Sequence, residues 1–249
     1  MSDFSNYSPK IAVLLLAAGQ ASRLGEPKQL LKWQGETLLE HSLGACLESA
    51  AAMTVTVLGA WKDEILRAVP ALKQAGVFDT SAPEARINGG KMDCGSGLEV
   101  PERSRLIIAE NSRWRDGMAS SLVTGLKAAV RVFPEAEGVM ICLADMPFLS
   151  SSLIDSVIAT WSKSGPETAR KRIAVPVFAG RRGHPVCFGS AFFAEMLELG
   201  GDRGAGSVIK KYPDQVIQIA ASGPEIFMDC DCREDYNRCL NMRIANADI

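Results

Sequence analysis

The feature that most constrains this chain is a continuous apolar segment at residues 11–19, IAVLLLAAG, which ends in glycine. Such a run predicts a parallel β-strand buried on both faces, since a half-exposed strand would alternate apolar with polar residues. A helical spacing of apolar residues follows at 35–50, then a strand-like stretch at 53–60 and a second helical stretch at 62–75. This order predicts a three-layer, doubly wound α/β fold with a mostly parallel sheet.

The alternation continues along most of the remaining chain. Further strands are predicted at 106–111, 137–147, 172–180, 215–222 and 225–232, and further helices at 118–133, 152–165, 190–201 and 233–244. Residues 80–105 interrupt it, because they are rich in Gly, Ser and Pro and have no sustained period. We therefore expect a single domain over residues 1–249, with a loop insertion at about 80–105.

Charge and composition restrict the class of partner. The net charge of −2 and the pI of about 5.8 disfavour nucleic acid, because binding its backbone needs an excess of basic residues. No apolar run approaches the roughly 20 residues that span a bilayer, and the first residues, MSDFSNYSPK, lack the pattern of a secretory signal. Seven scattered cysteines favour reduced thiols. We expect a cytoplasmic protein with neither a nucleic-acid nor a membrane partner.

The segment LLLAAGQASRLGEPKQLLKWQG places a glycine-containing turn after the first predicted strand, where open parallel sheets bind their ligands. The spacing of Gly19 and Gly25 fits neither the dinucleotide-binding pattern nor the Walker A loop. Gly19 can adopt a positive φ and let backbone N–H groups face an anion, and Arg23 and Lys28 can bind phosphate oxygens. A solvated turn with surface cations is the alternative.

The full pattern L-A-A-G-x-x-S-R-L-G-x-P-K-x-L-L-x-x-x-G-x-x-L-L resembles the start of the MobA-like nucleotidyltransferases, most closely the molybdenum cofactor cytidylyltransferase branch. Matching segments follow in order: VTVLGA, NSRWRDGMASSLVTGL, LADMPFLS, GRRGHPVCF, GGDRGAGSVIKKYPDQV and MDCDCREDY. The resemblance covers most of the chain outside 80–105 and the termini. It implies a Rossmann-like nucleotidyltransferase fold, and transfer of a nucleoside monophosphate from an NTP to a phosphorylated acceptor with Mg²⁺ as cofactor.

The resemblance also implies roles for individual residues. The nucleotide-binding residues would be Leu16, Ala17, Ala18, Gly19, Arg23, Lys28, Ser120 and Asp145. Of these, Arg23, Lys28 and Asp145 would be catalytic, while Asp145 and Asp231 would bind the metal ion. The acceptor-binding residues would be Gly183, His184, Pro185 and Asp202.

The residue types suit this chemistry. Carboxylate oxygens are ligands that Mg²⁺ prefers, and transfer at a phosphate needs in-line positioning and cations that offset charge on the leaving pyrophosphate. Asp229 lies two residues before Asp231, so both should point to one side of the strand predicted at 225–232. Asp145 could instead cap the next helix, Ser120 could be a plain helix cap, and His184 a hydrogen-bonded structural group.

Departures from the family pattern leave functional alternatives open. Gly206 stands where the family has arginine, with Arg203 as a candidate substitute, and residues 232–235 read CRED in place of T-P-E-D. Ala18 favours CTP, since the guanylyl branch reads L-A-G-G. We therefore expect CTP and the molybdenum-pterin cofactor as substrates, with a client molybdoenzyme or its chaperone as a partner. The alternatives are a guanylyltransferase or another NTP transferase with a different phosphorylated acceptor, and a non-transferase oxidoreductase or auxiliary protein on the same fold.

Overall fold

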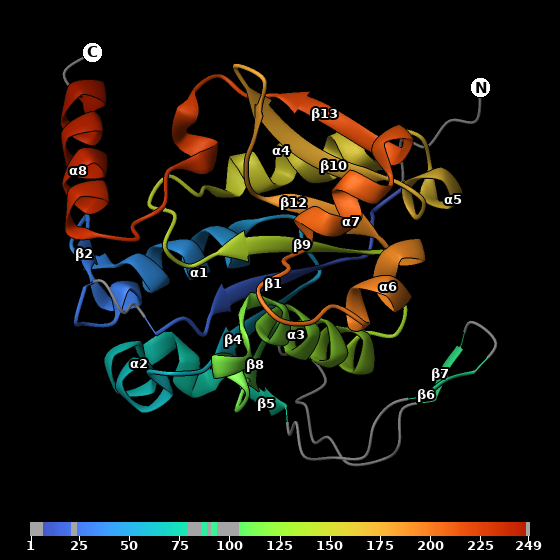
Figure 1. Ribbon diagram of the computed structural model, residues 1–249, viewed down its shortest axis with the longest axis horizontal. Helices are drawn as coiled ribbons and strands as arrows, with labels where there is room; N and C mark the ends of the chain where they lie inside the picture. Colours follow the sequence, from blue (N-terminus) through green and yellow to red (C-terminus); the bar gives the residue numbers. More distant parts are fainter. Residues whose placement is uncertain (1–6, 21–23, 79–85, 89–90, 94–104, 248–249) are drawn as a thin grey trace.

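The computed structural model describes residues 7–20, 24–78, 86–88, 91–93 and 105–247 (Figure 1). Within these residues nine strands form one mixed sheet in the order β11-β10-β12-β9-β1-β4-β8-β5, with β13 paired to β10. The strands are β1 (Ile11–Ala17), β4 (Met53–Leu58), β5 (Gly76–Phe78), β8 (Leu106–Glu110), β9 (Gly138–Leu143), β10 (Ile173–Phe178), β11 (Arg181–Arg182), β12 (Val186–Gly189) and β13 (Val216–Ala220). The predicted mostly parallel α/β fold is confirmed.

Strand β1 lies at the centre of the sheet, which explains its continuous apolar run. It pairs in parallel with β4 on one side and with β9 on the other, so that Leu16 lies beside both Val57 and Leu143. Strands β8 and β5 continue the parallel part beyond β4. Because these strands share one direction, the segments after them gather along one edge of the sheet, toward which the arrowheads of β1 and β9 point in Figure 1.

The other half of the sheet contains the antiparallel strands. β12, which the sequence did not predict, lies between β9 and β10 and runs antiparallel to both. β10 turns into β11 through Ala179 and Gly180, whose φ angles of 49° and 78° suit a two-residue hairpin turn.

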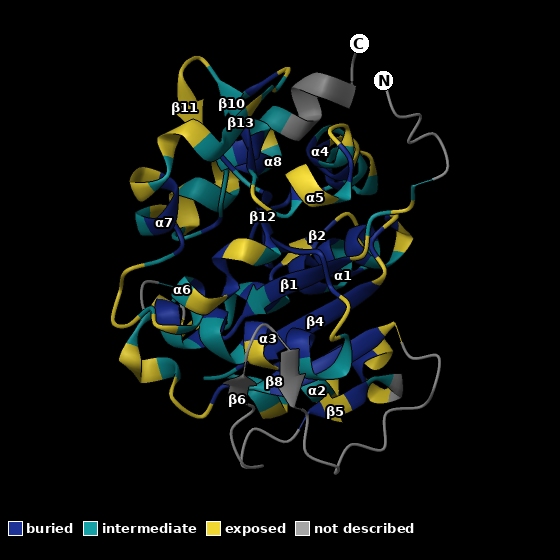
Figure 2. Cartoon of the chain, turned by 90° about the vertical axis from the view of Figure 1, so that its right-hand side faces the viewer, coloured by how far each residue is buried: buried dark blue, intermediate teal, exposed yellow. Residues whose placement is uncertain are grey.

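Helices cover both faces of the sheet. One face packs against α1 (Leu38–Glu48), α2 (Lys62–Ala68) and α4 (Ser151–Ser162), and the other against α3 (Met118–Val132), α6 (Phe193–Leu197) and α7 (Gly206–Lys211). Short helices α5 (Pro166–Ala169), η2 (Pro70–Gln74), η4 (Ser190–Phe192) and η5 (Pro213–Gln215) complete these layers. Figure 2 shows the strands β1 and β4 buried between the helices.

A smaller cluster attaches the last helix beside this sheet. The hairpin β2 (Lys32–Trp33) and β3 (Glu36–Thr37) packs through Trp33 against Cys230 and against Cys239 of α8 (Arg233–Ala247). The ring of Phe148 meets that of Trp33 edge-on, with 5.4 Å between centroids. This packing fixes the chain on both sides of residues 228–232, which approach the carboxyl edge of the sheet.

The structure corrects several predicted elements. The strand predicted at 225–232 is wrong: Pro224–Phe227 forms the 3₁₀ helix η6, and no strand follows before α8. Its backbone groups bond to distant parts of the chain instead of to a neighbouring strand, because the Ile226 carbonyl accepts the His184 N–H and the Cys230 N–H donates to the Asp145 carbonyl. The helix predicted at 62–75 ends at Ala68 because a proline follows at position 70.

The insertion at 80–105 lies largely outside the described residues. Within its described part, β6 (Arg86–Asn88) and β7 (Lys91–Asp93) pair as a short antiparallel hairpin. In the part of the chain that the structure describes, no helix is long and apolar enough to cross a membrane.

Candidate functional site

The carbonyl groups at the end of β1 and in residues 18–20 of the loop that follows it (the β1 loop) all accept hydrogen bonds from protein donors. The donors are the Ala144 amide to the Leu16 carbonyl (3.1 Å), Gln29 Nε2 to the Ala17 and Gly19 carbonyls (2.8 and 3.2 Å), the Ala60 amide to the Ala18 carbonyl (3.2 Å) and Trp61 Nε1 to the Gln20 carbonyl (2.8 Å). Among the described residues, the N–H groups of Ala18 and Gly19 donate to no protein acceptor. The loop therefore offers free donors and satisfied acceptors, the arrangement that suits an anionic ligand.

Gln29 holds this loop in place, and the sequence patterns did not single it out. It lies in η1 (Lys28–Leu30), is only 1% exposed, and donates from Nε2 to two loop carbonyls. Its Oε1 atom is buried without a hydrogen-bond partner in the described structure. In the sequence, the only sign of its role was its place next to Lys28 in the motif that follows the first strand. A sequence pattern does not distinguish a buried amide side chain from an exposed one.

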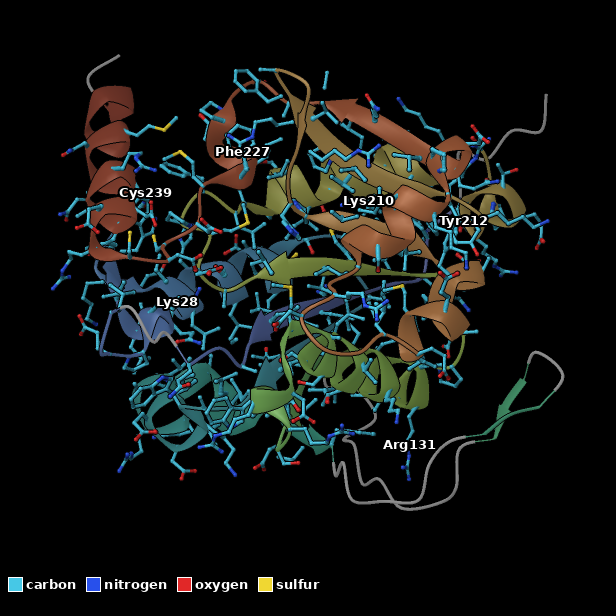
Figure 3. The ribbon with its side chains drawn as sticks, in the orientation of Figure 1. Lys28, Arg131, Lys210, Tyr212, Phe227 and Cys239 are labelled. Carbon is cyan, nitrogen blue, oxygen red and sulfur yellow. The ribbon has the colours of Figure 1, made fainter. Side chains whose placement is uncertain are left out.

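Lys28, the neighbour of Gln29, joins two of the predicted acidic residues. Its ammonium group bonds a carboxylate oxygen of Asp145 and, at 2.7 Å, Oδ1 of Asp231. Burial opposes the charge of Lys28, but the two carboxylates outweigh it and raise its pKa above the ordinary value. Lys28 is therefore a fixed cation between two carboxylates, and Figure 3 shows it below the start of α8.

Asp145 reaches this position because it follows the buried strand β9. The amide of the preceding residue bonds the β1 loop, and the Asp145 carbonyl accepts the N–H of Cys230. Asp145 does not cap the next helix, since Ser150 is the N-cap of α4 and its hydroxyl accepts the Leu153 N–H at 3.3 Å. The capping alternative for Asp145 is therefore wrong.

Asp229 adds a third carboxylate to the site, although the strand predicted to carry it does not form. Burial raises its pKa, and the negative charges of Asp145 and Asp231 raise it further. Three carboxylates thus surround the single ammonium of Lys28, which leaves the site with an excess of negative charge for another cation to balance.

These groups line one pocket of about 300 Å³ at the carboxyl edge of the sheet. Its walls consist of Leu16, Ala18, Gly19, Lys28, Gln29, Trp114, Gly117, Met118, Ser121, Leu143, Ala144, Asp145, Asp229 and Asp231. Six of the predicted site residues are among them: Leu16, Ala18, Gly19, Lys28, Asp145 and Asp231. The sequence missed Trp114 and Met118, although both lie in the matched segment NSRWRDGMASSL.

Other predicted residues lie beside the pocket. Ala17 is buried at the end of β1. The Ser120 hydroxyl donates to the Gly117 carbonyl at 2.8 Å, and its neighbour Ser121 lines the pocket instead. Arg23 lies outside the described residues.

The segment Gly183–His184–Pro185 connects β11 to β12 and packs against Ile226, shortly before Asp229 in the chain. A Cβ atom on Gly183 would lie 2.3 Å from the Ile226 carbonyl oxygen, and the His184 N–H donates to that oxygen at 2.7 Å. Burial lowers the pKa of His184, whose Nδ1 lies 3.5 Å from the Ile141 carbonyl oxygen. The contacts of this segment position Ile226, three residues before Asp229, and the lowered pKa favours the neutral form of His184 at pH 7.

Asp202 packs against the start of α3. Gly117, at φ 96°, has no room for a side chain, because a Cβ atom there would lie 2.5 Å from Asp202 Oδ1 and 2.6 Å from the Gly201 carbonyl oxygen. The Gly201 carbonyl also accepts the Ala119 N–H at 3.2 Å. Asp202 is exposed and lies beside the pocket wall at Gly117.

The unusual CRED turn keeps the function of a helix start. The Cys232 N–H and Sγ both lie near Oδ2 of Asp235, at 3.2 and 2.9 Å, just before α8 begins. The pairing resembles a capping box with a thiol in place of a hydroxyl. The substitution therefore leaves Asp231 directly before a capped helix.

The donor set fits a small divalent cation. Asp145 and Asp231 already converge on one positive group, the Lys28 ammonium, and their oxygens are of the type that Mg²⁺ prefers. Among the described residues, no group of three His, Cys, Asp or Glu side chains is placed to hold a metal ion. Two carboxylates suffice when substrate phosphates and water complete the coordination.

The family model of the MobA-like NTP transferase domain matches residues 13–216 of this chain. The chain belongs to this family.

Among its relatives is nicotine blue oxidoreductase of Paenarthrobacter nicotinovorans, 26% identical over 234 residues, or 93% of this chain and 97% of that protein. The probable molybdenum cofactor guanylyltransferase of Bacillus cereus (strain Q1) is 38% identical over 93 residues, which are 37% of this chain and 44% of that protein. The structure of Rv0371C in complex with manganese, from Mycobacterium tuberculosis H37Rv, has a TM-score of 0.65 and 23% identity over 93% of this chain and 98% of that one. This last likeness supports the Rossmann-like fold.

Proposed function

We propose that this chain is a Mg²⁺-dependent nucleotidyltransferase, a single domain that moves CMP from CTP onto the molybdenum-pterin cofactor and releases pyrophosphate. The observation that carries the proposal is the described start of the β1 loop, where the carbonyls of residues 18–20 are satisfied while the Ala18 and Gly19 amides are free, beside the Lys28 ammonium. Free amides and a cation next to carboxylates suit a triphosphate bound together with a metal ion.

In this proposal the NTP lies across the β1 loop. The Ala18 and Gly19 amides meet phosphate oxygens, and Lys28 and Arg23 offset charge on the departing pyrophosphate. Lys28 suits this role because its raised pKa keeps it charged and its bonds to Asp145 and Asp231 hold it beside the pocket.

Asp145 and Asp231 would hold Mg²⁺. The bound ion supplies positive charge to phosphate oxygens as charge develops on the leaving group. A manganese complex of a structural relative is in keeping with a divalent ion in this fold. Asp229 adds negative charge that strengthens attraction for a cation without acting as a ligand itself.

The acceptor would enter from the side of Gly183–Pro185 and Asp202, while Ser120, at the start of α3, would lie beside the nucleotide. Its phosphate is already ionised at neutral pH, so its attack needs positioning more than a general base. The neutral state of His184 is compatible with this. A client molybdoenzyme or its chaperone would receive the product.

CTP is preferred to GTP because Ala18 occupies a position that is glycine in the guanylyl branch. The similarity to a probable molybdenum cofactor guanylyltransferase supports the acceptor class, and GTP or another phosphorylated acceptor is the alternative within the class. A second candidate is an oxidoreductase on the same fold, favoured by the near full-length similarity to nicotine blue oxidoreductase. The lysine-bridged carboxylates favour the transferase.

The test is pyrophosphate release by the purified protein with Mg²⁺, molybdenum cofactor and each NTP in turn. We expect release with CTP, and its loss in Asp145→Asn. Asp214→Asn is the matched control, since Asp214 is exposed before β13 at the opposite edge of the sheet. No release with any NTP, together with turnover of nicotine blue in a redox assay, would replace the transferase by the oxidoreductase.

A further inference from the structure

Lys28 binds the two carboxylates to which the proposed function assigns the metal ion. Its ammonium group bonds a carboxylate oxygen of Asp145, and its Nζ atom lies 2.7 Å from Oδ1 of Asp231. A magnesium ion on the same two carboxylates would lie about 2.1 Å from their oxygens. The ammonium and the ion would then share nearly the same position, where two positive charges repel each other. The oxygens that Lys28 binds can therefore serve only one cation at a time.

The surroundings of Lys28 make this competition strong. The side chains of Lys28 and Asp145 are only 16% and 11% exposed, so solvent screens their attraction weakly. The backbone of Lys28 lies in η1, where the next residue, Gln29, is buried and bonds the carbonyls of Ala17 and Gly19. An ion that arrives alone must therefore displace an ammonium group that is fixed at its base and largely shielded from water.

A bound nucleotide offers the ammonium another set of oxygens. Lys28 lines the same pocket as Ala18 and Gly19, whose amides donate to no protein acceptor within the described residues. In the proposed function the triphosphate binds at these amides, so its oxygens enter the pocket that Lys28 already lines. A lysine carries three ammonium donors on a flexible stem. Its head can therefore turn from carboxylate to phosphate while its backbone stays in place.

We propose that Lys28 is an internal counter-ion that makes metal binding at Asp145 and Asp231 depend on the nucleotide. Without an NTP, the ammonium group occupies the two carboxylates and keeps a divalent ion out. The phosphates of an NTP draw the ammonium group away, and Asp145 and Asp231 then accept the ion that enters with the nucleotide. The part played by the NTP rests on the proposed function, whereas the competition between ammonium and metal ion needs only these three side chains.

The first test measures binding of Mn²⁺ alone, from the electron paramagnetic resonance signal of the free ion. We expect Lys28→Met to bind Mn²⁺ about 5- to 150-fold more tightly than wild type, the usual range of coupling between two sites. Lys28→Arg keeps a cation at this position and should stay close to wild type. Lys32→Met is the matched control, because Lys32 is exposed in β2 and its loss changes the net charge equally. Adding Asp145→Asn to Lys28→Met should abolish the gain.

The second test measures CTP binding in EDTA by calorimetry, so that phosphates and carboxylates compete for Lys28 without a metal ion. Asp145→Asn weakens the hold on the ammonium group and should strengthen CTP binding more than Asp229→Asn does. Asp229 lines the same pocket but forms no ion pair with Lys28 among the described residues. Equal gains in the two variants would mean that only the lost charge matters, and would overturn the transfer of Lys28 to phosphate.

Failure of this inference is distinguishable from failure of the proposed function. If Lys28→Met binds Mn²⁺ no more tightly than wild type and Lys32→Met, the counter-ion role is overturned, and pyrophosphate release from CTP by wild type still supports the transferase. Tighter Mn²⁺ binding by Lys28→Met, with no NTP bound by wild type, would refute the proposed function and keep the competition between lysine and metal ion. If Lys28→Met fails to fold, Lys28→Gln makes the same comparison, because its uncharged amide still donates to a carboxylate.

Discussion

Replacing Gln29 tests how the β1 loop is held. Gln29→Met keeps the length and approximate volume of the side chain but cannot donate to the Ala17 and Gly19 carbonyls. Gln29→Glu keeps the shape and replaces the Nε2 donor by a carboxylate oxygen. The two variants therefore separate loss of the hydrogen bonds from repulsion between oxygens.

The magnitudes follow from the contacts. Loss of two hydrogen bonds costs about 1 kcal/mol each, and relief of the unpartnered, buried Oε1 atom returns about 1 kcal/mol, so Gln29→Met should lose about 1 kcal/mol of unfolding free energy. Gln29→Glu loses the same bonds and also places a carboxylate, at a position only 1% exposed, against two carbonyl oxygens. We expect a loss of at least about 3 kcal/mol at pH 7.5.

The pH dependence of Gln29→Glu gives a further check. Burial and the facing carbonyls raise the pKa of a glutamate in this position above its unfolded value, because only the protonated acid can donate to a carbonyl. The folded state then binds more protons than the unfolded state, so the stability lost relative to wild type should shrink as the pH falls toward 4.5.

The assay is urea unfolding followed by circular dichroism, with Gln218→Glu as the matched control on the exposed strand β13. The control should change stability by less than about 0.5 kcal/mol. Equal stability of Gln29→Glu and Gln29→Met at pH 7.5 would refute the orientation of the amide, since it would mean that no carbonyl oxygen faces the position of Nε2. CTP binding measured on the same samples should weaken in both variants.

Three further predictions concern other parts of the molecule. Lys28→Met removes the ammonium between the site's carboxylates and should cost about 3 kcal/mol of unfolding free energy at pH 7, which urea unfolding measures. Gly183→Ala brings a Cβ atom against the Ile226 carbonyl and should lower stability by about 1–3 kcal/mol in thermal unfolding; an unchanged Tm would contradict the close packing. For Glu137, burial raises the pKa, but its hydrogen bonds and the Arg170 charge outweigh this and lower it. The stabilisation that Glu137 contributes should therefore be present above pH 4.5 and fade as the pH falls through the lower pKa of the folded state. The unfolding free energy of Glu137→Gln should then match that of wild type only in acid.

Much of the fold was predictable from local patterns. The run IAVLLLAAG predicted a strand buried on both faces, and β1 lies between β4 and β9. The strand predicted at 225–232 failed because the pattern MDCDC alternates like a strand, whereas its backbone groups bond to His184 and Asp145 from distant parts of the chain. Strand β12 was missed because a strand of four residues after a proline has too few positions to show a period.

By itself, the sequence determined the family, the central parallel strands and the loop, lysine and acidic residues on which the proposal rests, because each is a local pattern of residue types. Only the tertiary structure brought Lys28 between Asp145 and Asp231, turned the loop carbonyls toward Gln29, and placed Trp114 in the wall of the same pocket as the carboxylates. The Lys28–Asp145 pair joins residues 117 apart in the chain, and even the shorter contacts of Gln29 with the loop carbonyls, over 12 and 10 residues, depend on how the loop folds back. No local period records them, since the free energy that selects them arises from packing between segments distant in sequence.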